Sequence, residues 1–386
     1  MIELFYIYNL RQIFARKGQT FAVLFGVSLV VIVFCATLML SAGLKKTLAG
    51  TGSERNAMII RTGAENEVQS GIPRDNALAI EANNLFMRDS AGMPMVTKDI
   101  VVLSNLDKID GTGRSNVVVR GTNQSAYAIR PEVALISGRL PVPGTNELIV
   151  GQALTKRFII DSVLRLSGID YPIVGYFDAG QTGFSSEIWG DAEVLARNFN
   201  RQAYSSVVGK LASGVSIESL ETMLEGDKRL GVSVQTEKRF YESQSEKLSL
   251  FITILGTFVS VIFSLAAALG AMISMFGSVS SRRREIGILR SLGFGKLNIF
   301  ICFLLESTLL GLIGGIVGVC LSSFLMFFSL ATTNFSTFSE IGFGFSLTPV
   351  AIILSLLFAT IIGGIGGIIP AYSAARGKIL EVLRAN

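Results

Sequence analysis

Four long apolar stretches divide this chain of 386 residues. They cover residues 18–44, 247–279, 297–328 and 347–371. Because a helix needs about 20 apolar residues to cross the core of a bilayer, each stretch predicts a transmembrane helix. Residues 45–246 read like an ordinary soluble domain, since their hydrophobicity is not of the membrane-spanning kind.

The shorter segments complete this predicted arrangement. Residues 1–17 are rich in apolar side chains and predict a cytoplasmic or interfacial N-terminal helix, or an extension of the first span. Residues 280–296 predict a short cytoplasmic helix between the second and third spans. Residues 329–346 predict an external loop, and residues 372–386 a cytoplasmic tail.

Lysine and arginine residues give the spans a direction, because these side chains collect on the cytoplasmic side of membrane helices. All the clusters fall on one side only if there are four spans, both termini are cytoplasmic and residues 45–246 lie outside. A cleaved signal sequence that ends near Ser41-Ala42-Gly43 is an alternative for the first span and leaves the domain outside as well. The flanking basic residues are Arg11, Arg16, Lys17, Arg282, Arg283, Arg284, Arg290, Lys296, Arg376, Lys378 and Arg384.

The second span is longer than a bilayer requires. Its uncharged run, Leu248 to Ser281, would form a helix of about 50 Å at about 1.5 Å per residue, against a core of about 30 Å. We expect the excess to project from the membrane as a stalk that carries the external domain, with Ser243–Lys247 as its extension. A tilted helix without a transmitting role is the alternative.

The external domain is expected to be an α+β unit, formed by residues 45–95 and 200–240, with a β-rich insertion at residues 96–199. Residues 62–95 are poorly patterned and suggest no role beyond a loop, and Trp189 is expected to be a packing aromatic. The predicted fold class is therefore an α-helical membrane protein with four transmembrane helices and an α+β extracytoplasmic domain. Strands are predicted at 57–61, 117–120, 147–150, 173–177, 206–211 and 232–236, and a helix after Ser216.

The composition argues against an enzyme. The chain has no histidine, which excludes Ser-His-Asp catalysis and histidine metal sites. Its three cysteines, Cys35, Cys302 and Cys320, all lie in apolar runs. The phosphate-binding pattern Gly-x-x-x-x-Gly-Lys-[Ser/Thr] is absent from the sequence, so we expect no bound cofactor, no metal and no catalytic residue in this chain. The net charge of +5 is explained by topology, and nucleic acid is not an expected partner.

The most informative segment is the predicted cytoplasmic helix, which has an apolar stripe beside basic residues. We predict that this face docks a soluble cytoplasmic partner. The alternative is that the arginines only fix the topology and bind lipid phosphates. The residues predicted to couple the chain to a partner are Arg283, Arg284, Glu285, Ile286, Leu289, Arg290, Leu292 and Gly293.

Two features inside the predicted spans point to structural roles. Glu306 is a carboxylate within the third span, and we expect it to pair with an arginine of the cytoplasmic helix or to extend towards the interface. Small residues spaced along the third span predict close helix packing, including a contact between two copies of the chain. These glycines are Gly311, Gly314, Gly315 and Gly318.

These segments together resemble the FtsX/MacB-type ABC transporter permeases. The stretch 283–293 resembles the coupling segment of that family, 305–315 its third span and 370–376 its ending. The stretch 138–151 is similar to the MacB-type periplasmic core. Family tails often carry a proline after the Ala-Ala-Arg segment, where this chain has Lys378-Ile379.

The resemblance implies a permease subunit in a bacterial inner membrane, paired with a second copy or with a sister permease. It implies a dimer of cytoplasmic ABC ATPase subunits that hold ATP and magnesium, and motion transmitted through the stalks to the external domains. It further implies a periplasmic adaptor, an outer-membrane channel, and a lipid, lipoprotein, peptide or drug as cargo. The alternative within the family is an FtsX-like signalling protein that regulates a cell-wall hydrolase.

Overall fold

The computed structural model describes residues 17–108, 113–333 and 339–376, so the predicted N-terminal segment lies outside the described residues except for its last position. The chain separates into two compact units. The helical unit comprises Met1–Gly43, Leu250–Phe328 and Phe345–Asn386, and the β-rich unit comprises Leu44–Ser249 and Ser329–Gly344.

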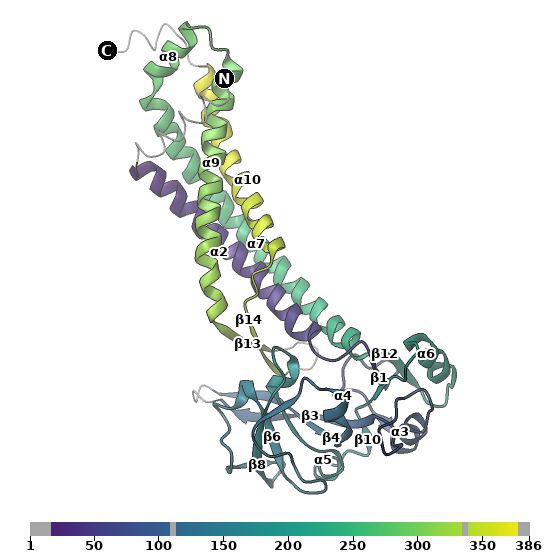
Figure 1. The fold of residues 1–386 in the computed structure, drawn as a ribbon. Coiled ribbons are helices and arrows are strands. Elements are labelled where there is room, and N and C mark those ends of the chain that lie inside the picture. The colour runs from purple at the N-terminus through teal and green to yellow at the C-terminus, as the bar shows by residue number, and fades with distance from the viewer. Residues whose placement is uncertain (1–16, 109–112, 334–338, 377–386) are drawn as a thin grey trace. The chain divides into compact units, whose positions relative to one another are not determined.

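Among the residues that the structure describes, four helices are long and apolar enough to cross a membrane, which confirms the four predicted spans by length and composition (Figure 1). They are α2 (Lys17–Ala49), α7 (Glu237–Ser281), α9 (Lys296–Ser323) and α10 (Pro349–Arg376). A 3₁₀ turn, η3 (Phe324–Phe327), follows α9. The short helix α8 (Arg283–Ser291) lies between α7 and α9 in the chain.

Helix α7 is longer than the predicted second span because it begins at Glu237. Its 45 residues correspond to about 68 Å of helix, roughly twice the core of a bilayer. The helix includes the polar segment Ser243–Lys247, as the sequence predicted. Its backbone is therefore continuous from the β-rich unit into the helical unit.

Glycines let the helices of the helical unit approach closely. A Cβ atom on Gly311 of α9 would lie 2.6 Å from the Ala359 carbonyl oxygen of α10. On the same helix, a Cβ on Gly318 would lie 2.8 Å from Val31 of α2. The spacing predicted for packing thus serves contacts within one chain, and Gly314 and Gly315 likewise face α2 and α10.

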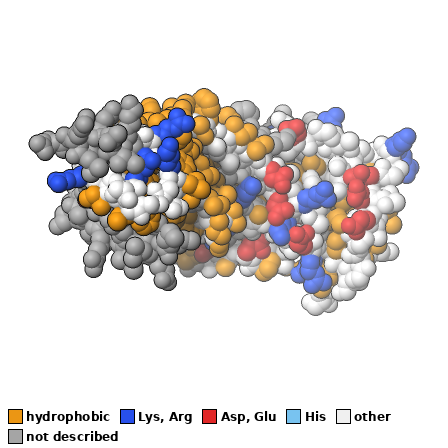
Figure 2. Space-filling view, turned by 90° about the horizontal axis from the view of Figure 1, so that it is seen from above, with side chains coloured by type: hydrophobic (Ala, Val, Ile, Leu, Met, Phe, Trp, Pro, Cys, Tyr) orange, Lys and Arg blue, Asp and Glu red, His pale blue; other side chains and the backbone are white. Residues whose placement is uncertain are grey.

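The outer surface of the helical unit is apolar. Hydrophobic side chains make up a large part of the surface in Figure 2. Along α7, Leu250, Phe258 and Ile273 are more than half exposed. Contiguous apolar surface of this kind is typical of contact with lipid or with another membrane helix.

The β-rich unit is built on a 10-stranded sheet with the order β12-β1-β11-β3-β4-β9-β6-β8-β5, in which β7 also pairs with β8. Most pairs are antiparallel, and β4–β9 and β6–β8 are parallel. The strands are β1 (Asn56–Arg61), β3 (Val96–Asp107), β4 (Arg114–Thr122), β5 (Ala134–Gly138), β6 (Leu148–Gly151), β7 (Val163–Leu166), β8 (Ile169–Asp178), β9 (Glu187–Asp191), β11 (Ser206–Lys210) and β12 (Val232–Thr236).

The sheet joins the two parts that the sequence analysis separated. Strand β11 pairs with β3 from Ser206↔Asp99 to Gly209↔Val96. The expected β-rich insertion is therefore not a separate layer, because its strands extend the same sheet. Helices α4 (Ser125–Ile129), α5 (Ala192–Asn198) and α6 (Ile217–Gly226) and the turns η1 (Gln152–Leu154) and η2 (Gly183–Ser186) complete this part.

The segment 62–95, to which the sequence assigned no role, contains regular structure. It includes β2 (Ile72–Pro73), which pairs with β10 (Ala203–Tyr204), and helix α3 (Arg74–Glu81). Ala77 and Ile80 of α3 are buried in the core. A helix of two turns is too short for its apolar period to stand out in the sequence.

The predicted external loop 329–346 also contains regular structure. Strands β13 (Ser329–Thr333) and β14 (Glu340–Gly344) form an antiparallel hairpin. The Gly342 amide donates to Ser186 Oγ of η2 at 3.2 Å, within the β-rich unit. The hairpin is thereby attached to the sheet domain by residues far away in sequence.

Trp189 belongs to a buried hydrophobic cluster of this unit. Its side chain is 0% exposed and packs against Phe177 and Phe184, with ring centroids 5.2 and 5.5 Å away. The indole Nε1 donates to Glu187 Oε2 at 2.7 Å. These contacts confirm that the only tryptophan of the chain is a packing residue, and they make it a probe of this unit.

Candidate functional site

The predicted coupling segment forms helix α8 and the turn that follows it. Gly293 has a φ of +95°, a conformation that glycine adopts without strain, and its amide donates to the Arg290 carbonyl. Gly295 precedes the first residue of α9. The structure thus ends the helix where the sequence predicted, and the segment is a helix–turn element between α7 and α9.

The side chains of α8 divide into an exposed set and a packed set. Arg283, Arg284 and Glu285 are exposed, whereas Leu289 is half-buried. Leu292, directly after the helix, is 71% exposed. These exposed positions agree with a surface that meets a partner.

Ile286 does not lie on that surface. It is 7% exposed and packs in a cluster with Met275, Ile299, Phe303 and Ala374. A small hollow lined by Ile286, Leu289, Phe294 and residues of α9 lies beside it. Direct contact of Ile286 with a partner is not supported by this geometry, because its own unit covers the side chain.

The apolar position that replaces it is Ile288, which is 47% exposed. Of the predicted stripe, Ile286 is buried in its own unit, Leu289 is half-buried and Leu292 is exposed. Ile288 and Leu292 therefore form the apolar part of the exposed face. Arg290 is half-buried, and its NH1 donates to the Ala375 carbonyl at 3.4 Å. This arginine meets the carboxyl end of α10, where a cation is favourable.

Glu306 pairs with the arginine that precedes α8. Arg282 NH1 and NH2 donate to the two carboxylate oxygens of Glu306 at 2.8 and 2.9 Å. Both side chains are buried, with exposures of 1% and 5%, and the guanidinium lies over the Phe303 ring. Such a two-bond pair fixes the beginning of α8 against α9, which agrees with the pairing that the sequence predicted.

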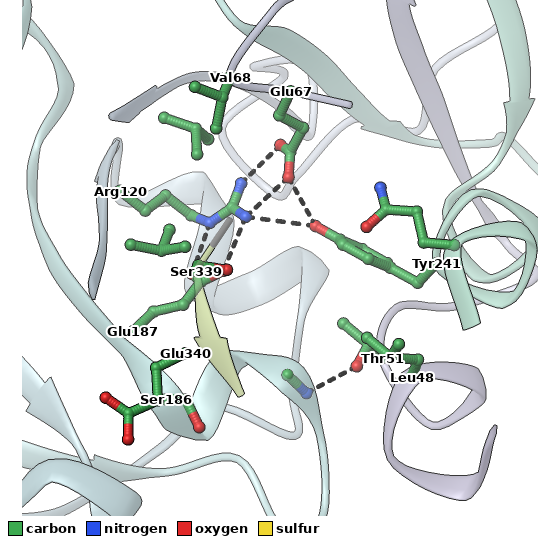
Figure 3. Close-up of a pocket in the computed structure, with 14 residues that line it drawn as sticks. Leu48, Thr51, Glu67, Val68, Arg120, Ser186, Glu187, Tyr241, Ser339 and Glu340 are labelled. Atoms are coloured by element: carbon green, nitrogen blue, oxygen red, sulfur yellow. Dashed lines mark hydrogen bonds and ion pairs between the residues drawn. The ribbon is translucent and has the colours of Figure 1, made fainter. Parts of the chain in front are cut away.

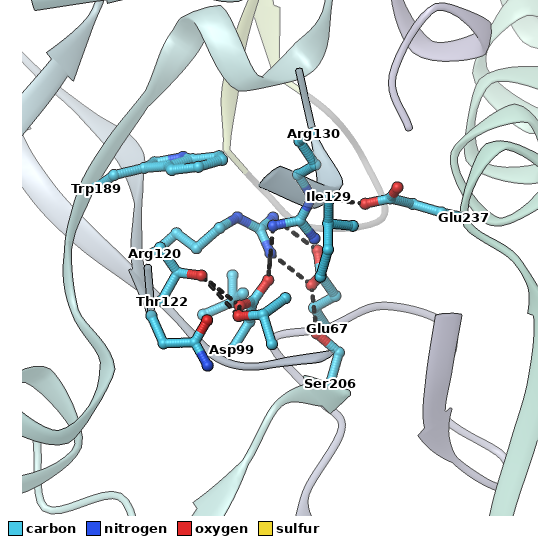
Figure 4. A network of polar contacts seen from close by, with 12 residues as sticks. Glu67, Asp99, Arg120, Thr122, Ile129, Arg130, Trp189, Ser206 and Glu237 are labelled. Atoms are coloured by element: carbon cyan, nitrogen blue, oxygen red, sulfur yellow. Dashed lines mark hydrogen bonds and ion pairs between the residues drawn. The ribbon is translucent and has the colours of Figure 1, made fainter. Parts of the chain in front are cut away.

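A second polar cluster, which the sequence analysis missed, lies inside the β-rich unit. Asp99 on β3 accepts from Arg120 on β4 and from Arg130 after α4, at 3.2 and 3.0 Å (Figure 4). Arg120 also donates to both oxygens of Glu67, at 2.7 and 2.8 Å. We call the residues Glu67, Asp99, Arg120, Arg130, Glu187, Glu237 and Tyr241 the buried charge network.

The network is closed off from solvent almost completely. The side chains of Arg120, Arg130, Asp99 and Glu237 are each no more than 1% exposed. Figure 3 shows Arg120 pointing to Glu67 on one side and to Glu187 on the other, with the Tyr241 hydroxyl beside it. A cavity at this place is also lined by Ser186 and Glu340.

The carboxyl groups of the network differ in their affinity for protons. Burial alone would raise the pKa of Glu67, but the charge and hydrogen bonds of Arg120 outweigh it and hold the pKa below its ordinary value. Burial opposes ionisation of Asp99 too, and the two arginines lower its pKa. Burial prevails for Glu187, whose pKa is raised despite Arg120. Of these three carboxyl groups, Glu187 is therefore the one that takes up a proton first as the pH falls.

These shifts predict an asymmetric response of the β-rich unit to acid. Because the pKa of Glu187 is raised, the folded state takes up a proton there at a higher pH than the unfolded chain does, so stability rises as the pH falls through that raised pKa. Below about pH 4, the ordinary range of carboxyl pKa values, the stabilisation from Glu67 and Asp99 is lost as pH falls through their lowered pKa values. The midpoint of thermal unfolding, followed by Trp189 fluorescence in the full chain, measures this.

The matching control for the acid response is Glu187→Gln. This variant should abolish the rise in stability above the ordinary carboxyl range while keeping the fall below about pH 4. A parent protein whose stability declines steadily from neutral pH downwards would contradict the assignment.

Two family models match the chain. The model of the FtsX-like permease C-terminal region matches residues 257–379, and that of the MacB-like periplasmic core domain matches residues 20–226. The first therefore spans α8 with most of the membrane helices, and the second spans much of the buried charge network.

Curated relatives carry the name macrolide export ATP-binding/permease protein MacB. The protein from Chromobacterium violaceum is 31% identical over 221 residues, which are 55% of this chain and 32% of that protein. The protein from Haemophilus ducreyi is 25% identical over 399 residues, which are 96% of this chain and 54% of that protein. The chain thus spans between about a third and about half of the length of these relatives.

Among solved structures, the periplasmic region of MacB from Actinobacillus actinomycetemcomitans is similar, with a TM-score of 0.39 and 10% sequence identity. The match covers 50% of this chain and 94% of that structure.

Proposed function

The chain belongs to the FtsX-like permeases with a MacB-like periplasmic core domain, a family of ABC transporter permeases, and we propose that it couples ATP hydrolysis by an ATPase subunit to motion of that core domain. The observation that carries the proposal is the exposed face of α8 next to α7. Nucleotide-driven closure of the ATPase moves α8, and α7 conveys the motion along its 45 residues.

The orientation follows from the charges on the helix ends. Membrane proteins carry an excess of Lys and Arg in their cytoplasmic loops. We therefore propose that Arg283 and Arg284 lie in the cytoplasm, together with the rest of α8 and both termini. The β-rich unit is then periplasmic, and the permease lies in the bacterial inner membrane. The apolar outer surface of α7 meets lipid or a second permease copy, either identical or a sister chain.

The cargo is handled outside the membrane in this proposal. Among the described residues of the four long helices, Glu306 is a buried acidic group of the helical unit, and its carboxylate forms an ion pair with Arg282. A path for a polar solute needs exposed polar groups along it, and the surfaces of these helices are apolar. We therefore propose export or extraction of a lipid, lipoprotein, peptide or drug through the periplasmic domain, with an adaptor and an outer-membrane channel as further partners.

The docking face is tested by adding charge to its two apolar residues. Ile288→Asp together with Leu292→Asp should weaken ATPase binding by about tenfold or more, since each exposed residue of this size contributes about 1.5 kcal/mol or more when a partner covers it. The measurement is copurification of the ATPase with the full chain in detergent, together with ATP hydrolysis by the complex. Substitution of Ile286 is not suitable for this test, because that side chain is part of the core and its loss would lower the stability of the chain as well.

The control variant is Ser291→Asp, which adds one negative charge at an exposed position of α8 without removing apolar surface. It should retain ATPase binding. If the double variant binds and stimulates the ATPase like the parent, α8 is not the docking site. Capture of a cell-wall hydrolase by the periplasmic domain in place of an adaptor would favour the signalling function.

A further inference from the structure

Two side chains at the start of α7, Glu237 and Tyr241, each form hydrogen bonds with the buried charge network. Glu237 and Tyr241 are four residues apart and therefore lie on the same face of the helix, one turn from each other. Glu237 is 0% exposed and Tyr241 is 6% exposed, so both are enclosed by the β-rich unit. The first two turns of α7 are thus part of that unit.

The first branch of the network leads from Glu237 into the sheet. Arg130 Nε donates to Glu237 Oε1 at 2.7 Å, and its NH1 donates to Asp99 Oδ2 at 3.0 Å. Arg120 NH1 donates to the same Asp99 oxygen at 3.2 Å. Charges of opposite sign therefore alternate from α7 to β3 and then to β4 (Figure 4).

The second branch returns from the sheet to the helix. Arg120 donates to both oxygens of Glu67, and the Tyr241 hydroxyl donates to Glu67 Oε2 at 3.0 Å (Figure 3). Arg120 NH2 also reaches the Tyr241 oxygen at 3.3 Å. The circuit that leaves α7 at Glu237 thus closes on α7 at Tyr241.

The other oxygen of Glu237 holds the segment that follows α2. It accepts from Asn56 Nδ2 at 2.7 Å and from the Ser53 amide at 3.3 Å. Gly52 has a φ of +80°, and a Cβ atom there would lie 2.5 Å from Glu237 Cγ. A side chain at position 52 would push the carboxylate away, so glycine permits this contact.

We propose that Glu237 and Tyr241 form a two-point clamp that makes the first turns of α7 and the central strands β3 and β4 one rigid body. A single contact would let the helix turn about it, whereas two contacts one turn apart fix both its rotation and its position along its axis. Charged hydrogen bonds suit this task because they constrain direction as well as distance. Transmission of motion through the clamp rests on the proposed function, but the clamp itself does not.

The test measures how firmly α7 is held in the full chain, reconstituted in lipid nanodiscs. The three native cysteines, one exposed and two buried, are replaced by alanine, and nitroxide labels are attached to cysteines at the exposed positions Ser243 on α7 and Asn105 on β3. Pulsed electron paramagnetic resonance then gives the distribution of distances between the labels. The parent should give one narrow distribution, and Glu237→Gln with Tyr241→Phe a broader one.

Hydrogen exchange supplies a second measurement on the unlabelled chain. Amides of residues 237–245 should exchange about tenfold faster or more in the double variant, because the helix start opens without the sheet. The control is Lys238→Ala, which removes the exposed pair with Glu54 at 3.1 Å on the same helical turn. This control should leave both the distances and the exchange unchanged.

The possible results separate a clamp from a stabilising network. A broader distribution far below the unfolding temperature supports the clamp, whereas a lower unfolding temperature with an unchanged distribution overturns it. If the double variant fails to fold, Tyr241→Phe alone, which removes only a hydroxyl, must broaden the distribution or the clamp is refuted. Absence of nucleotide-dependent movement in the parent bound to an ATPase would refute the proposed function and leave the clamp standing.

Discussion

Replacement of Arg120 with methionine is expected to remove much of the stability of the β-rich unit. The guanidinium is 1% exposed and bonds to Glu67, Asp99 and Glu187, all of them buried. Loss of one partner from a buried ion pair costs about 3–5 kcal/mol, because the remaining charge has neither water nor a counter-ion. Against a typical total of about 5–15 kcal/mol for a domain, this loss brings the unit close to unfolding.

Urea unfolding of the full chain in detergent, followed by Trp189 fluorescence, measures this effect. The tryptophan is the only one in the chain and lies in the affected core, so its signal reports on this unit. The control is Arg139→Met, because Arg139 makes a similar two-bond pair with Glu147 at the surface and is 53% exposed. That variant should unfold at nearly the same urea concentration as the parent.

A combined variant distinguishes a missing charge from a missing side chain. Glu67→Gln and Glu187→Gln, added to Arg120→Met, remove two of the carboxylates that the first change leaves unpaired. The combination should therefore recover part of the lost stability. If the combined variant is less stable than Arg120→Met alone, packing and not charge explains the role of Arg120.

The local pattern of the sequence was sufficient to predict those helices and strands whose apolar residues recur with a regular spacing or form a long run. The spans were predicted from length and hydropathy, and β11 and β12 from alternation over five or six residues. Continuity of the sheet was not predictable in this way. It depends on pairing between Ser206 and Asp99, which are separated by more than 100 positions and carry no local sign of their contact.

The buried charge network was missed for a related reason. Glu67, Asp99 and Arg120 belong to types that lie mostly at the surface, and each is unremarkable among its neighbours in sequence. One signal was present, because Arg120 follows the apolar run Val117 to Val119 and continues a strand whose flanking positions are buried. A charge within such a strand indicates a buried partner, but it does not identify that partner.

The coupling segment shows how much can be inferred from an amphipathic pattern. The helical spacing of Ile286, Leu289 and Leu292 indicated one apolar face, but it did not show which of these side chains the chain itself covers. For Ile286 that surface belongs to the same chain, since Met275 and Phe303 lie against it. The exposed residues Ile288 and Leu292 are then the ones left for a partner, and only the packed structure distinguishes the two sets.

Replacement of Glu306 with alanine is expected to have the largest effect in the helical unit. The change leaves the Arg282 guanidinium, which is 1% exposed, without the carboxylate that binds both of its terminal nitrogens. We expect a loss of about 3–5 kcal/mol, as for other buried pairs that lose one partner. Unfolding followed by the helical signal in circular dichroism should shift to lower denaturant, whereas the Trp189 transition of the β-rich unit should not.

Glu285→Ala is the matched control, because it removes an exposed carboxylate from α8 itself and should change stability little. A double-mutant cycle then isolates the pair. Arg282→Met combined with Glu306→Met should be more stable than either single change, since the apolar pair leaves no charge without a partner. Equal and additive losses would show that the two residues act independently, and the pair could then not be what fixes α8 to α9.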